Sequence, residues 1–168
     1  MKRLLYLVMA VVIVLAVSCK QDTPTNNNLL VVDGGSMNIV EASICQNDLD
    51  NDHFYIKLCL PDQSWMRIVL DGKTHFGKTI DLSQNDAPDL WLWYWSIEYF
   101  NIDLGVSINS DGNPSSTLPP FTRGTLFSER LPDKNGNPVL HLELNDGEYD
   151  GHTISLYFKG KVKPYYDE

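Results

Sequence analysis

The sequence has little that fits a catalytic or metal-binding template. Its 4 histidines show no H-x-x-x-H spacing, and the chain contains no G-x-S-x-G elbow, no phosphate-binding glycine loop and no C-x-x-C pair. Acidic residues are plentiful, but none of them forms a recognisable pair for glycoside hydrolysis. These absences predict a protein that is not an enzyme, with no catalytic residues, no metal site and no cofactor.

Basic residues are also scarce. The chain has 13 Lys and Arg against 22 Asp and Glu, which gives a net charge of −9. Two of the basic residues, Lys2 and Arg3, lie in a segment that we expect to be removed, and without them the net charge becomes −11. So acidic a surface repels phosphate backbones and anionic lipid headgroups. We therefore expect no nucleic-acid partner and no electrostatic docking to membranes.

Only one long apolar run occurs, Leu4–Val17, and it is short for a membrane span. A helix of about 14 residues covers about 21 Å, whereas the hydrocarbon core of a bilayer is about 30 Å thick. The run follows Lys2 and Arg3, and the small residues Ala16 and Ser18 precede Cys19. This order is typical of an export signal, so residues 1–18 are predicted to form a signal-peptide helix that is cleaved.

A cysteine directly after the small residues changes the type of export signal. Val17-Ser18-Cys19 resembles the lipobox of bacterial lipoproteins, although Ala16 stands where that family usually has Leu. The resemblance implies that Cys19 receives a diacylglycerol and becomes the new N-terminus. The alternative is ordinary signal-peptidase cleavage and a free cysteine. Residues 19–28 then comprise the lipidated cysteine and a polar tether, whose nine flexible residues would span about 15–18 Å.

Residues 29–168 show the pattern of a single β-domain. Apolar residues recur with period two, turn signals arrive every eight to fifteen residues, and no convincing helical period appears. The chain is predicted to be all-β, with an antiparallel two-sheet β-sandwich of about eight or nine strands. A lipocalin-like closed β-barrel is the alternative, because alternation alone does not distinguish the two.

Two hairpins can be predicted from matching apolar faces. Near the C-terminus, Leu142 is expected opposite Ile154 and Leu140 opposite Leu156. Between residues 38 and 61, the best pairing sets Ala42 near Ile56. That register separates Cys45 and Cys59 by some 13 Å, whereas a disulfide needs Cα atoms within about 7 Å. We therefore predict two free thiols.

The densest aromatic stretch is Leu90–Phe100. If the strand runs unbroken into the alternating residues 102–108, one face becomes an exposed aromatic platform suited to sugar rings. If instead a bulge or turn near Ser96–Glu98 shifts the phase, the tryptophans enter the core. The sequence leaves both alternatives open. The candidate ligand-binding residues on this face are Trp91, Trp93, Trp95 and Tyr99.

A second candidate is the acidic loop around Asp48, Asp50 and Asp52, which has the alternating oxygen ligands of a calcium loop. The match ends there, because an EF-hand loop needs Gly at its sixth position and Glu at its twelfth, and those positions hold His53 and Cys59. A solvated hairpin loop accounts for the same residues without calcium. Among the histidines, His141 alternates with apolar neighbours and is expected on an outer face, while His53 and His152 flank turns.

The whole arrangement resembles uncharacterised short bacterial lipoproteins of Bacteroidetes type. The resemblance is carried by the lipobox-like start, the polar tether and the loose motifs Gly77–Ser83 and Gly151–Ser155. It implies a cell-envelope protein of the outer membrane, with no side assigned and no active site to carry over. We expect a non-catalytic binding module, with glycans as one ligand class. The alternatives are an accessory or structural subunit bound to an envelope protein, and a lipocalin-like carrier of a small apolar ligand.

Overall fold

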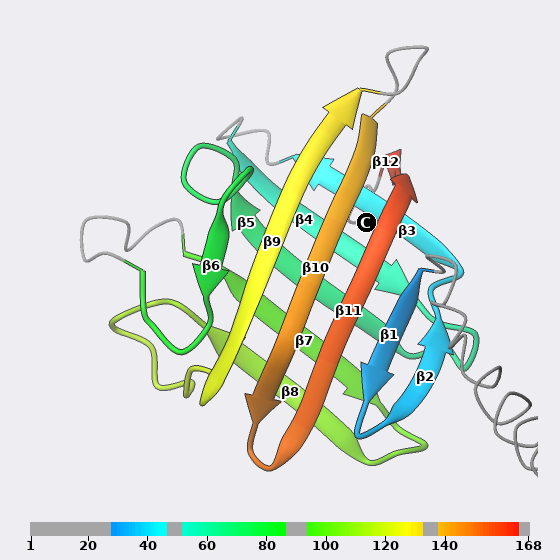
Figure 1. Ribbon diagram of the computed structural model, residues 1–168, viewed down its shortest axis with the longest axis vertical. Coiled ribbons are helices and arrows are strands. Elements are labelled where there is room, and N and C mark those ends of the chain that lie inside the picture. The colour runs from blue at the N-terminus through cyan, green and yellow to red at the C-terminus, as the bar shows by residue number, and fades with distance from the viewer. Residues whose placement is uncertain (1–27, 47–51, 87–93, 133–137, 165–168) are drawn as a thin grey trace, which may run out of the picture.

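The computed structural model describes residues 28–46, 52–86, 94–132 and 138–164. These residues form two mostly antiparallel β-sheets and contain no helix. Sheet A faces the viewer in Figure 1. Its spatial order is β2 (Gly35–Asn38), β1 (Leu29–Val32), β11 (His152–Lys161), β10 (Pro138–Tyr149), β9 (Arg123–Pro132) and β6 (Thr79–Asp81).

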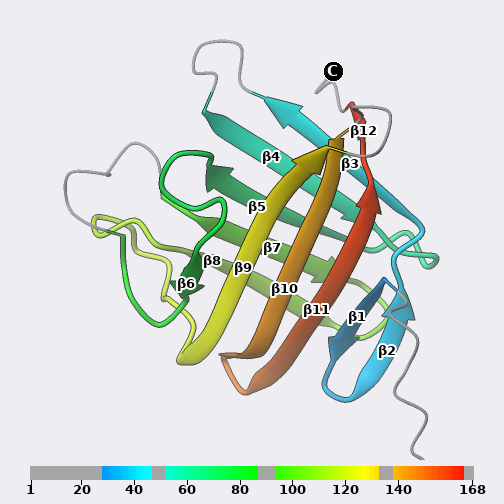
Figure 2. The same cartoon turned by 45° about the horizontal axis from the view of Figure 1, so that its top comes forward.

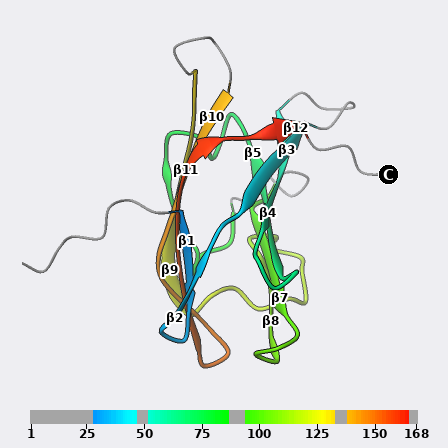
Figure 3. The same cartoon turned by 90° about the vertical axis from the view of Figure 1, so that its right-hand side faces the viewer.

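Sheet B lies behind sheet A. Its order is β12 (Lys163–Pro164), β3 (Glu41–Gln46), β4 (His53–Cys59), β5 (Trp65–Asp71), β7 (Ser96–Asn101) and β8 (Val106–Asp111). All neighbours in both sheets are antiparallel except β12, which runs parallel to β3. After β11 the chain crosses from one layer to the other to place β12 there, as Figure 3 shows from the side.

The two layers pack face to face, and neither sheet closes on itself (Figures 2 and 3). The prediction of an all-β sandwich is confirmed, and the lipocalin-like barrel is not the architecture. The described residues form twelve strands, where about eight or nine were expected. The additional strands are short, such as β2 and β12, or come from a turn that divides one expected strand into β7 and β8.

The core follows the alternation of the strands. Leu140, Leu142 and Leu144 of β10 are all 0% exposed and face sheet B, whereas His141 and Glu143 lie on the outer face. β4 and β5 repeat the pattern with their even-numbered residues inward. Burial of apolar area at about 25 cal/mol per Å² is what holds the layers together.

Tight Asp-Gly turns reverse the chain in sheet A. Asp33–Gly34 and Asp150–Gly151 both have positive φ at their two residues, as a type I′ turn requires. The second turn joins β10 to β11, so the expected hairpin exists. Its predicted register is wrong, because Leu142 lies opposite Phe158. The strand continues past Leu144 through a bulge and ends only at Tyr149, which moves the pairing along β11.

The register of β3 and β4 confirms the two free thiols. Cys45 lies opposite Tyr55, four residues before Cys59 on the same strand, so the two cysteines are well separated along the sheet. The pairing itself differs from the expected one by two residues, since Ala42 lies opposite Leu58. A shift of two residues keeps every side chain on its own face, and the apolar pattern therefore does not distinguish the two registers.

Candidate functional site

Of the candidate residues in the aromatic stretch, the two that the structure describes lie in the core and do not form an exposed platform. Trp95 is 0% exposed and Tyr99 is 1% exposed, so neither belongs to an exposed platform. Trp91 and Trp93 lie outside the described residues. The phase changes, but not through a bulge or turn at Ser96–Glu98. β7 ends at Asn101, the chain turns at residues 102–105, and β8 starts with even-numbered residues inward.

Trp95 is fixed by close packing and by its backbone. Its ring lies 6.4 Å from that of Phe121, measured between centroids, and Gly112 passes so close that an added Cβ would come within 2.7 Å of the indole. The backbone N–H of Trp95 donates to Asp86 Oδ2 at 2.8 Å, and its carbonyl accepts from the N–H of Gly112 at 2.9 Å. This tryptophan therefore has a structural role in the core.

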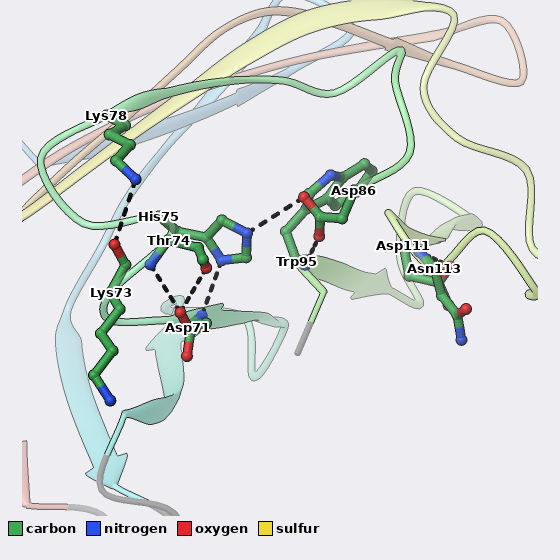
Figure 4. A network of polar contacts seen from close by, with 9 residues as sticks. All are labelled: Asp71, Lys73, Thr74, His75, Lys78, Asp86, Trp95, Asp111 and Asn113. Carbon is green, nitrogen blue, oxygen red and sulfur yellow. Dashed lines mark hydrogen bonds and ion pairs between the residues drawn. The ribbon is translucent and has the colours of Figure 1, made fainter. Parts of the chain in front are cut away.

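The same network contains a buried histidine–aspartate pair, His75 and Asp86 (Figure 4). The Asp71 N–H donates to His75 Nδ1 at 2.9 Å, so Nε2 carries the ring proton and faces Asp86 Oδ1 at 3.4 Å. Thr74 donates to the Asp71 carboxylate from both its N–H and its hydroxyl. His75 is only 3% exposed. These hydrogen bonds hold the loops at this end of the sandwich together around the buried His75.

An accessible cluster lies elsewhere, on the outer face of sheet A. We call it the His141 face, and it consists of Phe127 and Glu129 of β9, His141 and Glu143 of β10, and Tyr157 of β11. These residues face outward because their even-numbered neighbours, such as Leu142 and Leu126, fill the core. In Figure 1 the outer surface of β9, β10 and β11 faces the viewer, and no described element crosses in front of it.

His141 stands at the centre of this face. Its ring lies edge-on to Phe127 on one side, at 5.5 Å between centroids, and to Tyr157 on the other, at 5.7 Å. Nε2 is 2.7 Å from Glu143 Oε1, and Nδ1 is 3.9 Å from Glu129 Oε2. Only 13% of the His141 side chain is exposed, against 39% for Glu129 and 36% for Glu143. Three rings, those of Phe127, His141 and Tyr157, therefore lie next to one another, with the partly exposed carboxylates of Glu129 and Glu143 beside them.

Sequence reasoning found only part of this cluster. It placed His141 on an outer face, which the burial of Leu140 and Leu142 confirms. It did not group His141 with Phe127 and Tyr157, which are 14 and 16 positions away and become neighbours through strand pairing. A usable signal was present, because Tyr157 lies between the apolar Leu156 and Phe158 and Phe127 follows the apolar Leu126.

The acidic loop and the other histidines do not form a metal site among the described residues. Asp48 and Asp50 lie outside the described residues, and Asp52 forms an ion pair with Lys73. His53 is buried at the start of β4, and His152 Nδ1 lies 2.8 Å from Asp33 Oδ2 beside the β1–β2 turn. Within the described part of the chain, no three His, Cys, Asp or Glu side chains come together as a metal site.

Cys19 and the segments 1–18 and 20–27 also lie outside the described residues. The part of the chain that the structure describes contains no helix long and apolar enough to cross a membrane. Comparison of the chain with protein-family models, with curated proteins and with solved structures finds no match.

Proposed function

We propose that this chain is a lipid-anchored lipoprotein of the bacterial cell envelope, at the outer membrane, that binds neutral glycans without catalysing a reaction. The anchor is assigned to Cys19 from the lipobox-like Val17-Ser18-Cys19. The ligand is assigned to the His141 face. The observation that carries this second assignment is the ring of His141 held between Phe127 and Tyr157, with two accessible carboxylates beside it.

The chemistry of this face suits a sugar. The C–H faces of a pyranose pack on aromatic rings, and its hydroxyl groups donate hydrogen bonds to carboxylates such as Glu129 and Glu143. The two aromatic rings are held by contacts with His141, so few rotamers are lost when a ligand binds. The carboxylates and the net charge of −9 disfavour acidic polysaccharides, which is why the proposal is restricted to neutral glycans.

The glycan assignment is tested by titrating a panel of neutral oligosaccharides into the protein, with calorimetry and melting temperature as readouts. At least one oligosaccharide is expected to bind, and Tyr157→Ala is expected to weaken its Kd at least tenfold, because a ring that covers the sugar is lost. Tyr55→Ala is the matched control. Tyr55 is a half-buried tyrosine on the outer face of sheet B, and its loss should leave Kd unchanged.

Two results would count against the glycan assignment. One is a panel in which no sugar changes the melting temperature, and the other is equal binding by the Tyr157→Ala and Tyr55→Ala variants. The anchor is tested separately, by the intact mass of the chain matured in a bacterial host. A mass that begins at Cys19 and includes acyl groups is expected. A mature chain without acyl groups would overturn the lipoprotein assignment.

A further inference from the structure

Large exposed hydrophobic side chains gather at one end of sheet B. Within the described ranges, the large hydrophobic residues classed as exposed are Val40 at 60%, Phe100 at 45%, Ile102 at 75% and Leu104 at 55%. Val40 precedes β3, whereas the other three belong to the end of β7 and its following turn. β3 starts and β7 ends at the same end of the sheet, on the right in Figure 1.

Strand pairing shows how close these residues are. Glu41, Cys59, Trp65 and Phe100 lie opposite one another in a row across β3, β4, β5 and β7. Val40 lies one residue before Glu41, at the β3 side of this row, and Ile102 lies two residues after Phe100, at its β7 side. The half-buried Trp65 lies between them on the outer face. We call these residues the apolar rim, and its members are Val40, Trp65, Phe100, Ile102 and Leu104.

The rim is held in place by hydrogen bonds. Asn101, which is 1% exposed, donates from Nδ2 to Asp62 Oδ2 at 2.8 Å, and its Oδ1 accepts from the N–H of Leu104 at 2.8 Å. The β4–β5 turn and the β7–β8 turn are thereby joined through one buried side chain. The exposed Ile102 and Leu104 thus sit on a fixed turn, and a fixed exposed apolar turn is a surface ready for contact.

The chain that leads to Cys19 enters at this same end. Asn28 is the first described residue, and its carbonyl accepts from the N–H of Ile39 at 2.9 Å, next to Val40. The sequence places only nine residues between Cys19 and Leu29, and a flexible chain of that length spans about 15–18 Å. An anchor at Cys19 would therefore hold the bilayer within reach of the rim at a high effective concentration.

The side chains next to the rim suit a lipid–water interface. Tryptophan favours this position, because its indole has an apolar body and one polar N–H, and Trp65 is the member of the rim that offers it. The next row inward on the same outer face contains Lys57, Arg67 and Glu98, and the ion pair between Arg67 and Glu98 at 2.6 Å makes this row polar. Asp62 and Asp103 at the turns limit the contact to a shallow one.

We propose that the apolar rim is a second membrane contact, with Ile102, Leu104 and Trp65 entering the interfacial layer of the bilayer that holds the anchor. This inference rests on the proposed acylation of Cys19, which supplies the first contact. Two weak contacts are what stable attachment of an anchored protein needs. The contact is apolar, so the acidity of the chain does not prevent it. It also fixes the orientation of the domain and leaves the outer face of sheet A accessible.

The test uses the whole chain, matured in a bacterial host and reconstituted into phosphatidylethanolamine and phosphatidylglycerol vesicles whose acyl chains carry bromine. Bromine quenches nearby tryptophans, and the difference between the wild type and Trp65→Phe isolates Trp65. We expect Trp65 to account for at least half of the quenching. The double variant I102E/L104E should reduce this part at least threefold. The matched control S115E/T117E, which adds the same charges at the opposite end of the sandwich, should not change it.

The outcomes separate this inference from the anchor. An acylated chain without Trp65-dependent quenching overturns the membrane contact and leaves the anchor in place. An unacylated chain that still floats with vesicles, and loses flotation in I102E/L104E but not in S115E/T117E, supports the rim and overturns the anchor. An unacylated chain that does not float overturns both.

Discussion

The aromatic residues at the two ends of β7 differ in their exposure to solvent. Trp95, just before the strand, is 0% exposed, whereas Phe100 near its other end is 45% exposed. Both ends have a network of hydrogen bonds between turns. At the Trp95 end the network connects Asp71, His75 and Asp86, and at the Phe100 end it connects Asp62 and Asn101.

The difference between these ends lies in what the networks hold. At the Trp95 end, hydrogen bonds of His75 and Asp86 hold the loops in contact with a fully buried aromatic residue. At the Phe100 end, a buried asparagine holds a turn whose large apolar side chains remain in solvent. Burial of those side chains would favour the folded state, so their exposure gives the domain no stability. An apolar surface kept exposed on a fixed turn is typical of a contact site.

The largest expected effect concerns the two aromatics themselves. Trp95→Ala should lower the free energy of unfolding by about 3–5 kcal/mol, because a fully buried ring leaves a cavity. Phe100→Ala should lower it by less than about 1 kcal/mol, since much of this ring is already in water. Urea denaturation at pH 7 measures both. Equal losses at the two positions would contradict the contrast between the ends.

The tight packing at the Trp95 end predicts a second effect. Gly112→Ala should cost about 1–3 kcal/mol, because the new Cβ would overlap the indole of Trp95 and force the ring or the strand to move. Ser115→Ala, three residues later in an exposed turn, is the control and should stay within about 0.5 kcal/mol of the wild type. Thermal and urea denaturation of the two variants provide the comparison, and a neutral Gly112→Ala would show that the packing is loose.

Acid should weaken the network at the Phe100 end. Burial raises the pKa of Asp62, but hydrogen bonds from Ser64 and Asn101 outweigh it and hold this pKa below its ordinary value of 3.8. A carboxyl whose pKa is lowered by folding stabilises the protein above pH 3.8, and this contribution disappears as the pH falls through the lowered pKa.

Asp62→Asn should therefore cost about 0.5–1 kcal/mol at pH 7, because the amide places an N–H group against Asn101 or Ser64. The difference from the wild type should shrink below pH 3.8, where the wild-type carboxyl also becomes protonated. Urea midpoints between pH 2.5 and 7 follow this change. A difference that is constant over the whole range would mean that the charge of Asp62 plays no part.

The smallest expected effect on stability is at the rim. Ile102→Ser and Leu104→Ser should change the free energy of unfolding by no more than about 0.5 kcal/mol each, because both side chains are more than half exposed. Both variants should fold normally in urea denaturation experiments. A loss of 2 kcal/mol or more at either position would show that the side chain supports the core.

Alternation predicted much of the fold from the sequence. The period of two identified the sandwich and placed His141 outside, because both depend only on which face a residue occupies. Cys45 and Cys59 stay apart in the expected and in the observed register, because Cys59 lies at least four residues beyond the partner of Cys45 in both. Registers were wrong by an even number of residues in both predicted hairpins, for the same reason: an even shift leaves the faces unchanged.

The candidate sites were less predictable, because they depend on turns and on strand neighbours. One of the two alternatives continued the aromatic stretch as an unbroken strand past Phe100, but Gly105 with its positive φ ends a turn there and the chain reverses. Only this turn puts Ile102 and Leu104 at an exposed tip. The His141 face and the apolar rim each combine side chains from three or more strands or turns, and no local pattern specifies that combination.

Hydroxyl-radical footprinting of the matured chain tests the contrast between the ends most directly. The protein is labelled once in solution with its acyl groups removed by protease cleavage in the tether, and once anchored in vesicles. We predict that Ile102 and Leu104 are oxidised in solution and at least threefold less on vesicles, whereas Trp95 is unreactive in both. Equal oxidation of Ile102 and Leu104 in the two states, or ready oxidation of Trp95 in the folded protein, would contradict the account.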